Sequence, residues 1–455
     1  MTTLEDLLAA HGGGTGLAAA VRAGTVGAAA PAAAARSQIV RRDHDLHAFT
    51  QLTSRIAEVA RGPLSGLPLA VKDNIDVAGT VTSLGRPLSE QTFAQADAPA
   101  VAALVRAGAV VIGKTNLPEF ATSAITSNAT FGDAVNPWDP SRTPGGSSGG
   151  SAVAVAAGMA VAGLATDTAG SAVIPAALTG VWGLRPSHGA IALNGVAPLS
   201  PSLDTVGLIA VDALTLDAHH AVLTPGMTHP EHETLDHAGD HLGGLRIALL
   251  TGWFADTDPG IAATTVEFAA RLAAHGGRLH QAELRGAEHA FSQARVIYAA
   301  ETAASIARLA PPNAQRRPRT QPTQYAASVE RRRTARHTTS EVAAARNARA
   351  PWQREIQSLF TDADVLLCPV TPMTAPPRDA GEEAVSRLVR LTYPFCFAGQ
   401  PLVSIPVGWP ASLPAGAMLV GPSNSDRALL RIAATIQTAG ASASAAPPTS
   451  PREHP

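Results

Sequence analysis

Three residues of the chain have types that could together activate a nucleophile. Lys72 follows the apolar run 66–71, and a lysine can act as a base when burial keeps its amine neutral. Ser147 lies in a stretch of glycine and serine, and Ser171 follows small residues that leave its hydroxyl accessible. A serine hydroxyl is a poor nucleophile until a base removes its proton. The combination could therefore activate a serine hydroxyl as a nucleophile.

Each of these segments also has a purely structural interpretation. A lysine at a strand end often extends its amine to solvent, and a Gly-Ser stretch is often a flexible linker. The segment 165–175 could be a plain turn between two buried elements. The Gly-Ser stretch at 143–151, however, leads directly into an apolar Ala-Val run and not into polar sequence. Glycines at a helix start bring backbone N–H groups close to a bound group, which favours a site.

The elements that must position these residues alternate between strand and helix, which indicates an α/β architecture. We expect strands at 66–71, 109–112, 245–250, 278–284, 365–368 and 402–405. We expect helices at 3–8, 45–61, 98–107, 152–161 and 261–274, with an Ala-rich loop before the second. The apolar run 152–165 is too short and too rich in small residues for a membrane span, so a buried helix is expected there.

The composition narrows the classes of protein that the chain can belong to. A length of 455 residues with 45% hydrophobic residues allows one large core or two smaller ones. The net charge of −2 gives no sign of a basic surface for nucleic acid, and an aromatic content of 4% argues against a set of rings for base stacking. The two cysteines, Cys368 and Cys396, form no CxxC motif, and the first residues are acidic, unlike a secretory signal. A cytoplasmic protein without a membrane or nucleic-acid partner is expected.

Two motif-like segments indicate ordinary structure and not a further site. Residues 108–115 formally match a phosphate-binding P-loop, but the residues between the glycines are apolar and form the predicted strand itself. The run 229–241 has metal-ligand residue types without a helical HExxH order, so an exposed loop is expected. No metal and no organic cofactor is expected.

Jointly, the motifs resemble those of the amidase signature family. The matching stretches are Val-Lys-Asp-Asn at 71–74, Gly-Gly-Ser-Ser-Gly-Gly at 145–150 and Asp-Thr-Ala-Gly-Ser at 167–171, with further segments at 113–120, 136–138, 183–186, 364–369 and 398–401. The resemblance covers most of the chain. It implies a single large α/β domain in which α-helices sandwich a mixed twisted sheet. We expect a helical N-terminal segment (1–60) packed on this domain (61–437), and a disordered tail at 438–455.

The resemblance also implies a role for each catalytic residue. Lys72 would be the base, Ser147 a proton relay held in a cis peptide, and Ser171 the nucleophile that forms an acyl-enzyme with a small-molecule amide. Ser148 would support the loop by hydrogen bonding, and Asp167 would brace the turn. The oxyanion hole is expected at the backbone N–H groups of Thr168, Ala169, Gly170 and Ser171.

Two departures from the family pattern leave the substrate open. Ala169 replaces the glycine of the common form, and an Ala-Gly-Ser version also occurs in allophanate hydrolases. Val173 and Ile174 stand where most members carry an arginine two or three residues after the nucleophile. Without that guanidinium, a small acidic substrate held at this point is disfavoured, unless Arg185 or the cluster 331–333 replaces it.

Several functions therefore stay open beside amide hydrolysis. They are allophanate or carboxybiuret-type ureide hydrolysis, a role like that of the A subunit of a tRNA-dependent amidotransferase with partner chains, and a degenerate, non-catalytic binding protein. A Ser-His mechanism through His188 is disfavoured because no histidine lies in the three segments. Pocket walls are expected near 123–131, 298–333 and 393–397. Many relatives are dimers, and a homodimer is one arrangement that the resemblance allows.

Overall fold

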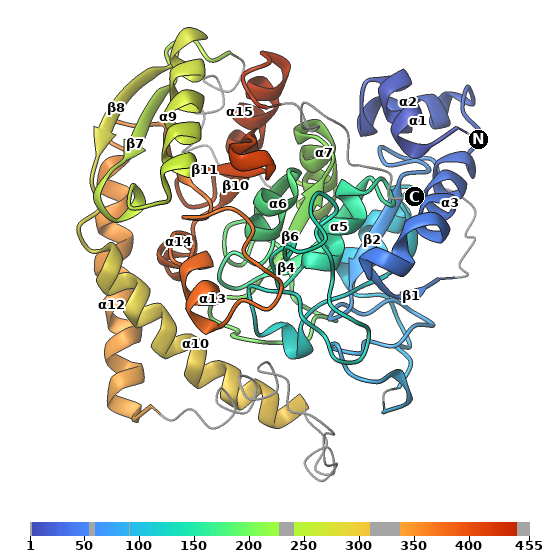
Figure 1. The fold of residues 1–455 in the computed structure, drawn as a ribbon, viewed down its shortest axis with the longest axis horizontal. Helices are drawn as coiled ribbons and strands as arrows, with labels where there is room; N and C mark the ends of the chain where they lie inside the picture. The colour runs from blue at the N-terminus through green and yellow to red at the C-terminus, as the bar shows by residue number, and fades with distance from the viewer. Residues whose placement is uncertain (1, 54–59, 91, 227–240, 310–336, 444–455) are drawn as a thin grey trace.

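A mixed β-sheet runs through the middle of the molecule (Figure 1). The computed structural model describes residues 2–53, 60–90, 92–226, 241–309 and 337–443. Within these ranges the sheet has eleven strands in the order β1-β3-β2-β4-β6-β5-β10-β11-β9-β7-β8. The strands are β1 Phe49–Leu52, β2 Pro68–Lys72, β3 Val110–Thr115, β4 Ala162–Asp167, β5 Trp182–Arg185, β6 Thr205–Ala210, β7 Arg246–Leu250, β8 Arg278–Ala282, β9 Val365–Pro369, β10 Leu402–Gly408 and β11 Ala415–Val420.

Helices flank this sheet, which confirms the predicted α/β fold. They are α1 Leu4–His11, α2 Gly14–Ala23, α3 Ala30–Leu46, α4 Pro99–Arg106, α5 Gly149–Ala156, α6 Val173–Thr179, α7 Ala213–Leu223, α9 Pro259–Ala274, α10 Ala287–Leu309, α12 Thr339–Leu359, α13 Glu382–Leu388, α14 Tyr393–Ala398 and α15 Asp426–Thr438, with short 3-10 turns at Leu88–Glu90, Glu119–Ala121, Gly252–Phe254 and Pro410–Ser412. In Figure 1, α1–α3 lie at the end of the molecule that holds β1, and α9 lies beside β7 and β8 at the other end. None of the helices in the described ranges is long and apolar enough to cross a membrane.

Strand β2 is central to the arrangement because it pairs in parallel with both β3 and β4. Every residue of β2 and β4 is buried, as expected for strands that are covered on both faces. Parallel strands end at the same edge of a sheet. The carboxyl ends of β2, at Lys72, and of β4, at Asp167, therefore lie side by side and define where the site forms.

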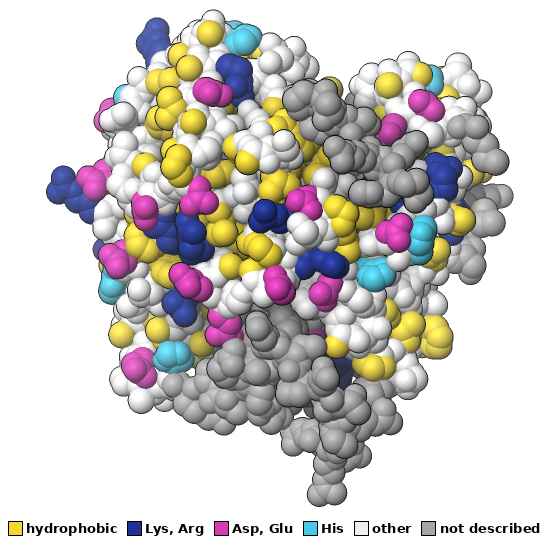
Figure 2. All heavy atoms as spheres, viewed as in Figure 1, with side chains coloured by type: hydrophobic (Ala, Val, Ile, Leu, Met, Phe, Trp, Pro, Cys, Tyr) yellow, Lys and Arg dark blue, Asp and Glu magenta, His cyan; other side chains and the backbone are white. Residues whose placement is uncertain are grey.

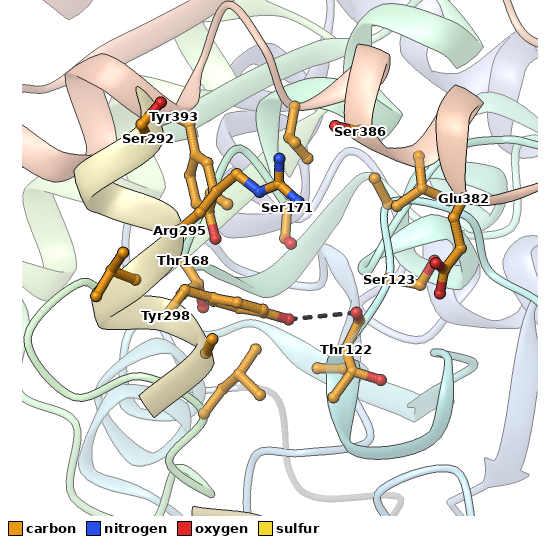
Figure 3. A pocket seen from close by; sticks show the side chains of 18 of the residues that line it. Thr122, Ser123, Thr168, Ser171, Ser292, Arg295, Tyr298, Glu382, Ser386 and Tyr393 are labelled. Atoms are coloured by element: carbon orange, nitrogen blue, oxygen red, sulfur yellow. Dashed lines mark hydrogen bonds between the residues drawn. The ribbon is translucent and has the colours of Figure 1, made fainter. Parts of the chain in front are cut away.

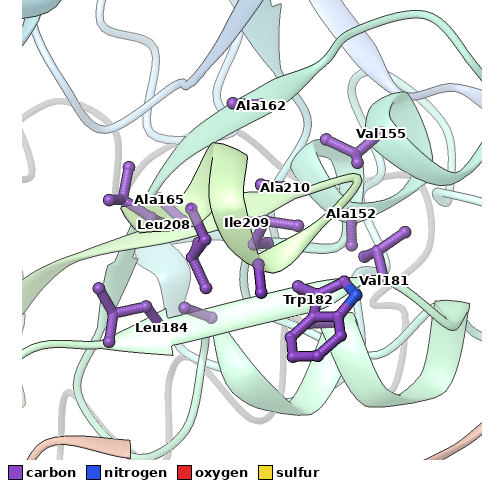
Figure 4. Packing of buried hydrophobic residues seen from close by; sticks show 14 of the residues in the cluster. Ala152, Val155, Ala162, Ala165, Val181, Trp182, Leu184, Leu208, Ile209 and Ala210 are labelled. Atoms are coloured by element: carbon purple, nitrogen blue, oxygen red, sulfur yellow. The ribbon is translucent and has the colours of Figure 1, made fainter. Parts of the chain in front are cut away.

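The helix after the Gly-Ser stretch packs closely on the sheet because its residues are small. In Figure 4, Ala152 and Val155 of α5 lie beside side chains of β4, β5 and β6. A Cβ at Gly150 would stand 2.4 Å from the backbone nitrogen of Asn116 and 2.5 Å from the carbonyl oxygen of Ala48. Only glycine lets the first turn of α5 approach these backbones.

Two of the predicted helices are wrong. The apolar run 152–165 holds the end of α5, a turn and strand β4, so the predicted helix at 152–161 starts three residues late and runs into the turn. Within 45–61, residues Phe49–Leu52 form β1, which pairs with β3, while 54–59 lie outside the described residues. The helices of this part of the chain are α2 and α3, which lie where an Ala-rich loop was expected.

The end of the described chain is packed against the body. Ala441 is buried, and the N–H of Ala443 donates to the carbonyl of Pro406 at 3.0 Å. The remainder of the predicted tail, residues 444–455, lies outside the described residues. On the face shown in Figure 2, basic and acidic side chains are interspersed, as the balanced composition suggests.

Candidate active site

Lys72 is a fully buried amine at the end of β2. Its Nζ donates to Ser147 Oγ at 2.8 Å and to Thr166 Oγ1 at 2.9 Å. No carboxylate of the described residues lies within salt-bridge distance of it. Burial lowers the pKa of Lys72 from 10.5 to about 7, although the more distant charges of Asp167 and Asp204 act to raise it. The amine is thus partly neutral near neutral pH and can accept a proton.

The loop before α5 brings Ser147 to this amine. The peptide bond between Gly146 and Ser147 is cis, and both Ser147 and Ser148 are buried. Ser148 donates from its Oγ to the carbonyl of Thr166 at 3.2 Å and from its N–H to the carbonyl of Ser171 at 3.2 Å. Ser148 therefore ties the loop to the end of β4 and to the turn that carries Ser171, as expected of a supporting residue.

Ser171 lies on the turn between β4 and α6 and is half-buried. In contrast to Lys72 and Ser147, it lines a cavity. The hydroxyls of Ser147 and Ser171 form no hydrogen bond with each other in the described structure. Lys72 and Ser147 are thus hydrogen-bonded, and the relay from Ser147 to Ser171 stays a prediction.

Asp167 holds the shape of this turn. Its carboxylate accepts the N–H groups of Gly170 and Ala172, each at 2.8 Å. It also pairs with the fully buried Arg185, whose Nη1 lies 2.8 Å from Asp167 Oδ1. The carboxylate thus fixes the backbone on both sides of Ser171.

One of the four N–H groups of the predicted oxyanion hole, that of Gly170, donates to Asp167, while the oxyanion hole itself stays a prediction. Because the Gly170 N–H already donates to a carboxylate, it is not available to a substrate. The N–H groups of Thr168, Ala169 and Ser171 donate to no group among the described residues, and all three residues line the cavity. Gly170 instead allows the turn itself: its φ is 110°, and a Cβ there would stand 2.5 Å from Thr392 Oγ1.

Sequence analysis missed two residues around the base. Thr166 accepts from both Lys72 and Asn74, the latter at 3.0 Å. Thr166 was missed because β4 was not recognised as a strand, and its uniformly buried residues give no alternating pattern that would have revealed it. Asn74 lies within the matched Val-Lys-Asp-Asn motif, two residues after Lys72, and this closeness in the sequence could have indicated it.

The lysine of the P-loop-like segment has a structural role. Lys114 is fully buried, and its Nζ lies 2.8 Å from Asp73 Oδ1. Its position in β3 agrees with the interpretation of this segment as a strand. No phosphate can reach an amine that is enclosed and paired in this way.

The cavity in front of Ser171 has a volume of about 470 Å³, suited to a small molecule (Figure 3). Each predicted wall region contributes to it, through Ser123, Tyr298 and Tyr393. Tyr298 also donates from its hydroxyl to the carbonyl of Thr122 at 3.2 Å, which joins α10 to the opposite wall. Arg295 on α10 and the residues of α13, which complete the walls, were not predicted.

Other candidate residues lie away from the reaction centre. His188 does not line the cavity, and its Nε2 lies 3.3 Å from the carbonyl oxygen of Pro201. Burial is the main cause that lowers the pKa of His188. Val173 and Ile174 are buried in the core. Arg185 forms an ion pair with Asp167, so it is not available to replace the arginine that most members of the resembled family carry after the nucleophile.

Two further candidates fall largely on residues that are not described. The cluster 331–333 and most of the histidine-rich run, 229–240, lie outside the described residues. His241, the last of that run, is exposed. In the ranges that the structure does describe, no group of three or more histidine, cysteine or acidic side chains could hold a metal.

Comparisons with known proteins found relatives that match most of the chain. A family model described as Amidase matches residues 32–430. The A subunit of the glutamyl-tRNA(Gln) amidotransferase of Symbiobacterium thermophilum is 33% identical over 435 residues, which cover 88% of this chain and 88% of that protein. The peptide amidase of Stenotrophomonas maltophilia superposes with a TM-score of 0.81 at 28% identity, covering 96% of this chain and 99% of that one.

A third similar protein is a chain of a vestigial protein complex that reveals the evolutionary origins of an s-triazine catabolic enzyme. It has a TM-score of 0.81 at 29% identity and covers 94% of this chain and 98% of its own. The family model spans the site and all eleven described strands of the sheet, and the sequence motifs fall within it. The chain therefore belongs to the amidase family, as its signature motifs predicted.

Proposed function

We propose that this chain hydrolyses carboxamide C–N bonds through an acyl-enzyme on Ser171. The observation that carries the proposal is the fully buried amine of Lys72, 2.8 Å from the Ser147 hydroxyl and behind a serine that opens into a cavity. Membership of the amidase family supports the reaction class. The geometry supports the assignment of roles.

In the first half of the reaction, neutral Lys72 takes the proton of Ser147 while Ser147 takes the proton of Ser171. The Ser171 oxygen forms a bond to the carbonyl carbon, and the carbonyl electrons move to its oxygen. The N–H groups of Thr168, Ala169 and Ser171 stabilise that oxyanion. The C–N bond then breaks as Ser147 passes a proton to the nitrogen, and an amine or ammonia leaves.

In the second half, water replaces the amine. The same relay removes a proton from water as it attacks the ester carbon, and the Ser171 oxygen leaves with a proton returned through Ser147. The product is a carboxylic acid. The missing bond between the two serine hydroxyls does not contradict this route, because catalytic hydrogen bonds often tighten only when substrate binds.

Labelling with a fluorophosphonate probe tests the nucleophile. Wild-type protein should be labelled and Ser171→Ala should not, and the same variant should lose ammonia release from a panel of aliphatic, aryl and ureido amides. Absence of labelling in wild type would favour the non-catalytic binding protein. Amide hydrolysis that survives in Lys72→Ala would refute the assigned base. Ammonia released from allophanate or carboxybiuret, but not from simple amides, would favour the ureide alternative.

A role within an amidotransferase complex is the second candidate. It is favoured by the 33% identity to the A subunit of a glutamyl-tRNA(Gln) amidotransferase. In that case the chain would need partner chains for full activity. Amide hydrolysis by the purified chain alone, at a rate that the added partner chains of such a complex do not change, would exclude this candidate.

We also propose a cytoplasmic location, as expected from the sequence. Cys368 and Cys396 are both buried and free of a disulfide. Burial raises the pKa of both thiols, so neither forms a reactive thiolate. Two such cysteines are compatible with a reducing compartment.

A further inference from the structure

The cavity contains a cation that the proposed mechanism does not use. Arg295, on α10, lines the cavity together with Ser171, and in Figure 3 its guanidinium extends from the helix toward Ser171. Its one contact in the described structure is with the Phe291 ring, whose centroid lies 5.6 Å from the arginine Cζ. No described carboxylate or carbonyl accepts from it. Five N–H donors and a permanent charge are therefore available inside the cavity.

Neighbouring arginines differ from Arg295 in this respect. Arg387, on α13, lies 2.8 Å from the carboxylate of Asp258, and Arg390 lies 3.1 Å from that of Asp256. Both are satisfied by residues outside the reaction centre. Arg295 thus stands out as a cation that faces the cavity without an anion from the described protein.

The other charged walls limit where an anion can lie. Glu382, on α13, and His337 also line the cavity. In Figure 3, Glu382 lies on the side opposite α10. A substrate anion is therefore attracted to the α10 side, where Arg295 lies. The turn that carries Ser171 adds no cation of its own, because residues 167–174 include no lysine or arginine.

We propose that Arg295 binds a carboxylate of the substrate, so that the chain prefers amides that carry an anionic group. The planar guanidinium matches the two oxygens of a carboxylate and can donate to both. This inference rests on the proposed amidase function. The carboxylate could belong to the acyl part or to the leaving amine, and the substrates chosen for the test separate the two.

The test compares substrates that match in shape and differ in charge. Glutaramate and 5-methylhexanamide differ by a carboxylate against an isopropyl group on the acyl side. Pentanoylglycine and N-isobutylpentanamide differ in the same way on the amine side. For one of the two pairs, wild type should have the higher kcat/KM with the anionic member. Arg295→Gln should reduce that preference by about tenfold or more, since bonds to charged groups are among the stronger ones.

The change should appear mainly in KM, because the carboxylate is bound equally before and during the reaction. Arg295→Lys should keep part of the preference, since it retains the charge without the planar fork. Arg308→Gln is the matched control: it removes the same charge from the same helix at a position that does not line the cavity. Its preference should equal that of wild type.

The inference would be overturned if wild type had equal kcat/KM for both members of each pair, or if Arg295→Gln kept the same preference. Hydrolysis that depends on Ser171 would still support the proposed function in either case. Calorimetric titration of the same four amides into Ser171→Ala measures the preference without turnover. If the anionic member of neither pair binds that protein more tightly than its neutral partner, the role of Arg295 is refuted even in an inactive chain.

Discussion

Replacing Lys72 by methionine should abolish catalysis and, near neutral pH, stabilise the fold. Burial lowers the pKa of Lys72 from 10.5 to about 7. Each pKa unit corresponds to about 1.4 kcal/mol, so enclosing this lysine costs roughly 4 kcal/mol at pH 7. Methionine removes that cost but also removes the two hydrogen bonds that Lys72 donates, to Ser147 and to Thr166, at about 1 kcal/mol each. The expected net gain is roughly 2 kcal/mol.

The stability difference between Lys72→Met and wild type should depend on pH. The unfolded lysine holds its proton up to pH 10.5, whereas the folded one loses it at about pH 7. Between these values the unfolded state binds more protons, so the stability of wild type rises with pH. The advantage of Lys72→Met should be full below pH 7 and should shrink steadily as the pH approaches 10.5.

Lys114→Met is a matched control with the opposite expected sign. Lys114 is as fully buried as Lys72, but its Nζ lies 2.8 Å from Asp73 Oδ1. Its removal leaves a buried carboxylate unpaired, which costs about 3–5 kcal/mol. The same substitution should therefore stabilise the protein at one buried lysine and destabilise it at the other.

Urea unfolding followed by tryptophan fluorescence, from pH 7 to 10, measures the three proteins side by side. The midpoint of Lys72→Met should exceed that of wild type at pH 7, and the difference should vanish at about pH 9 and reverse by about pH 10. If Lys72→Met loses as much stability as Lys114→Met, or if its difference from wild type is the same at every pH, burial does not depress the pKa of Lys72. The assigned base would then be charged at working pH, and the mechanism would fail.

The remaining predictions concern the rate. The kcat/KM of wild type should rise with pH along a limb centred near 7, because Lys72 must be neutral, and a flat pH–rate profile would contradict this. Asp167→Asn should lower kcat and destabilise the fold by about 3–5 kcal/mol, because it leaves Arg185 without its counter-charge; kinetics with urea unfolding check both effects. Gly170→Ala should also lower kcat, because a Cβ at φ 110° would stand 2.5 Å from Thr392 Oγ1, and an unchanged kcat would show that the turn tolerates the shift.

The three catalytic candidates could be selected from the sequence because their motifs together resemble those of the amidase signature family, whereas each local signal alone also had a structural interpretation. Lys72 ends a strand of continuous apolar residues, which buried parallel strands produce. Ser147 and Ser171 lie among glycines and small residues that a tight loop requires. What local signals could not give is their distance from one another, since Lys72 and Ser147 are 75 positions apart in the chain.

The errors arise where local pattern is ambiguous. The run 152–165 is apolar throughout, and periodicity cannot separate a buried helix from a buried strand. The break between them falls at Gly158, whose φ of 69° ends the helical turn. Strand β1 exists because it pairs with β3, more than fifty positions further along the chain, and this tertiary contact is invisible in the residues of β1 themselves.

The donors and charges around Ser171 were harder to predict because residues compete for the same partner. Four consecutive N–H groups looked equivalent in the sequence, but the carboxylate of Asp167 takes the one on Gly170. Arg295 lies more than a hundred positions after Ser171 and reaches the cavity only because α10 forms one of its walls. Neither fact follows from residue type and spacing alone.

The site also has to hold a neutral amine near a buried carboxylate, and its hydrogen bonds show how. Asp167 favours the charged form of Lys72 and so opposes the role of base that we propose for it. That carboxylate is fully engaged, however, by Arg185 and by the N–H groups of Gly170 and Ala172. Because a cation and two backbone dipoles offset its charge, Asp167 can fix the turn around Ser171 while burial still dominates the pKa of Lys72. Asp167 therefore braces the turn, while burial sets the pKa of Lys72. The same small region can serve both purposes because they depend on different interactions.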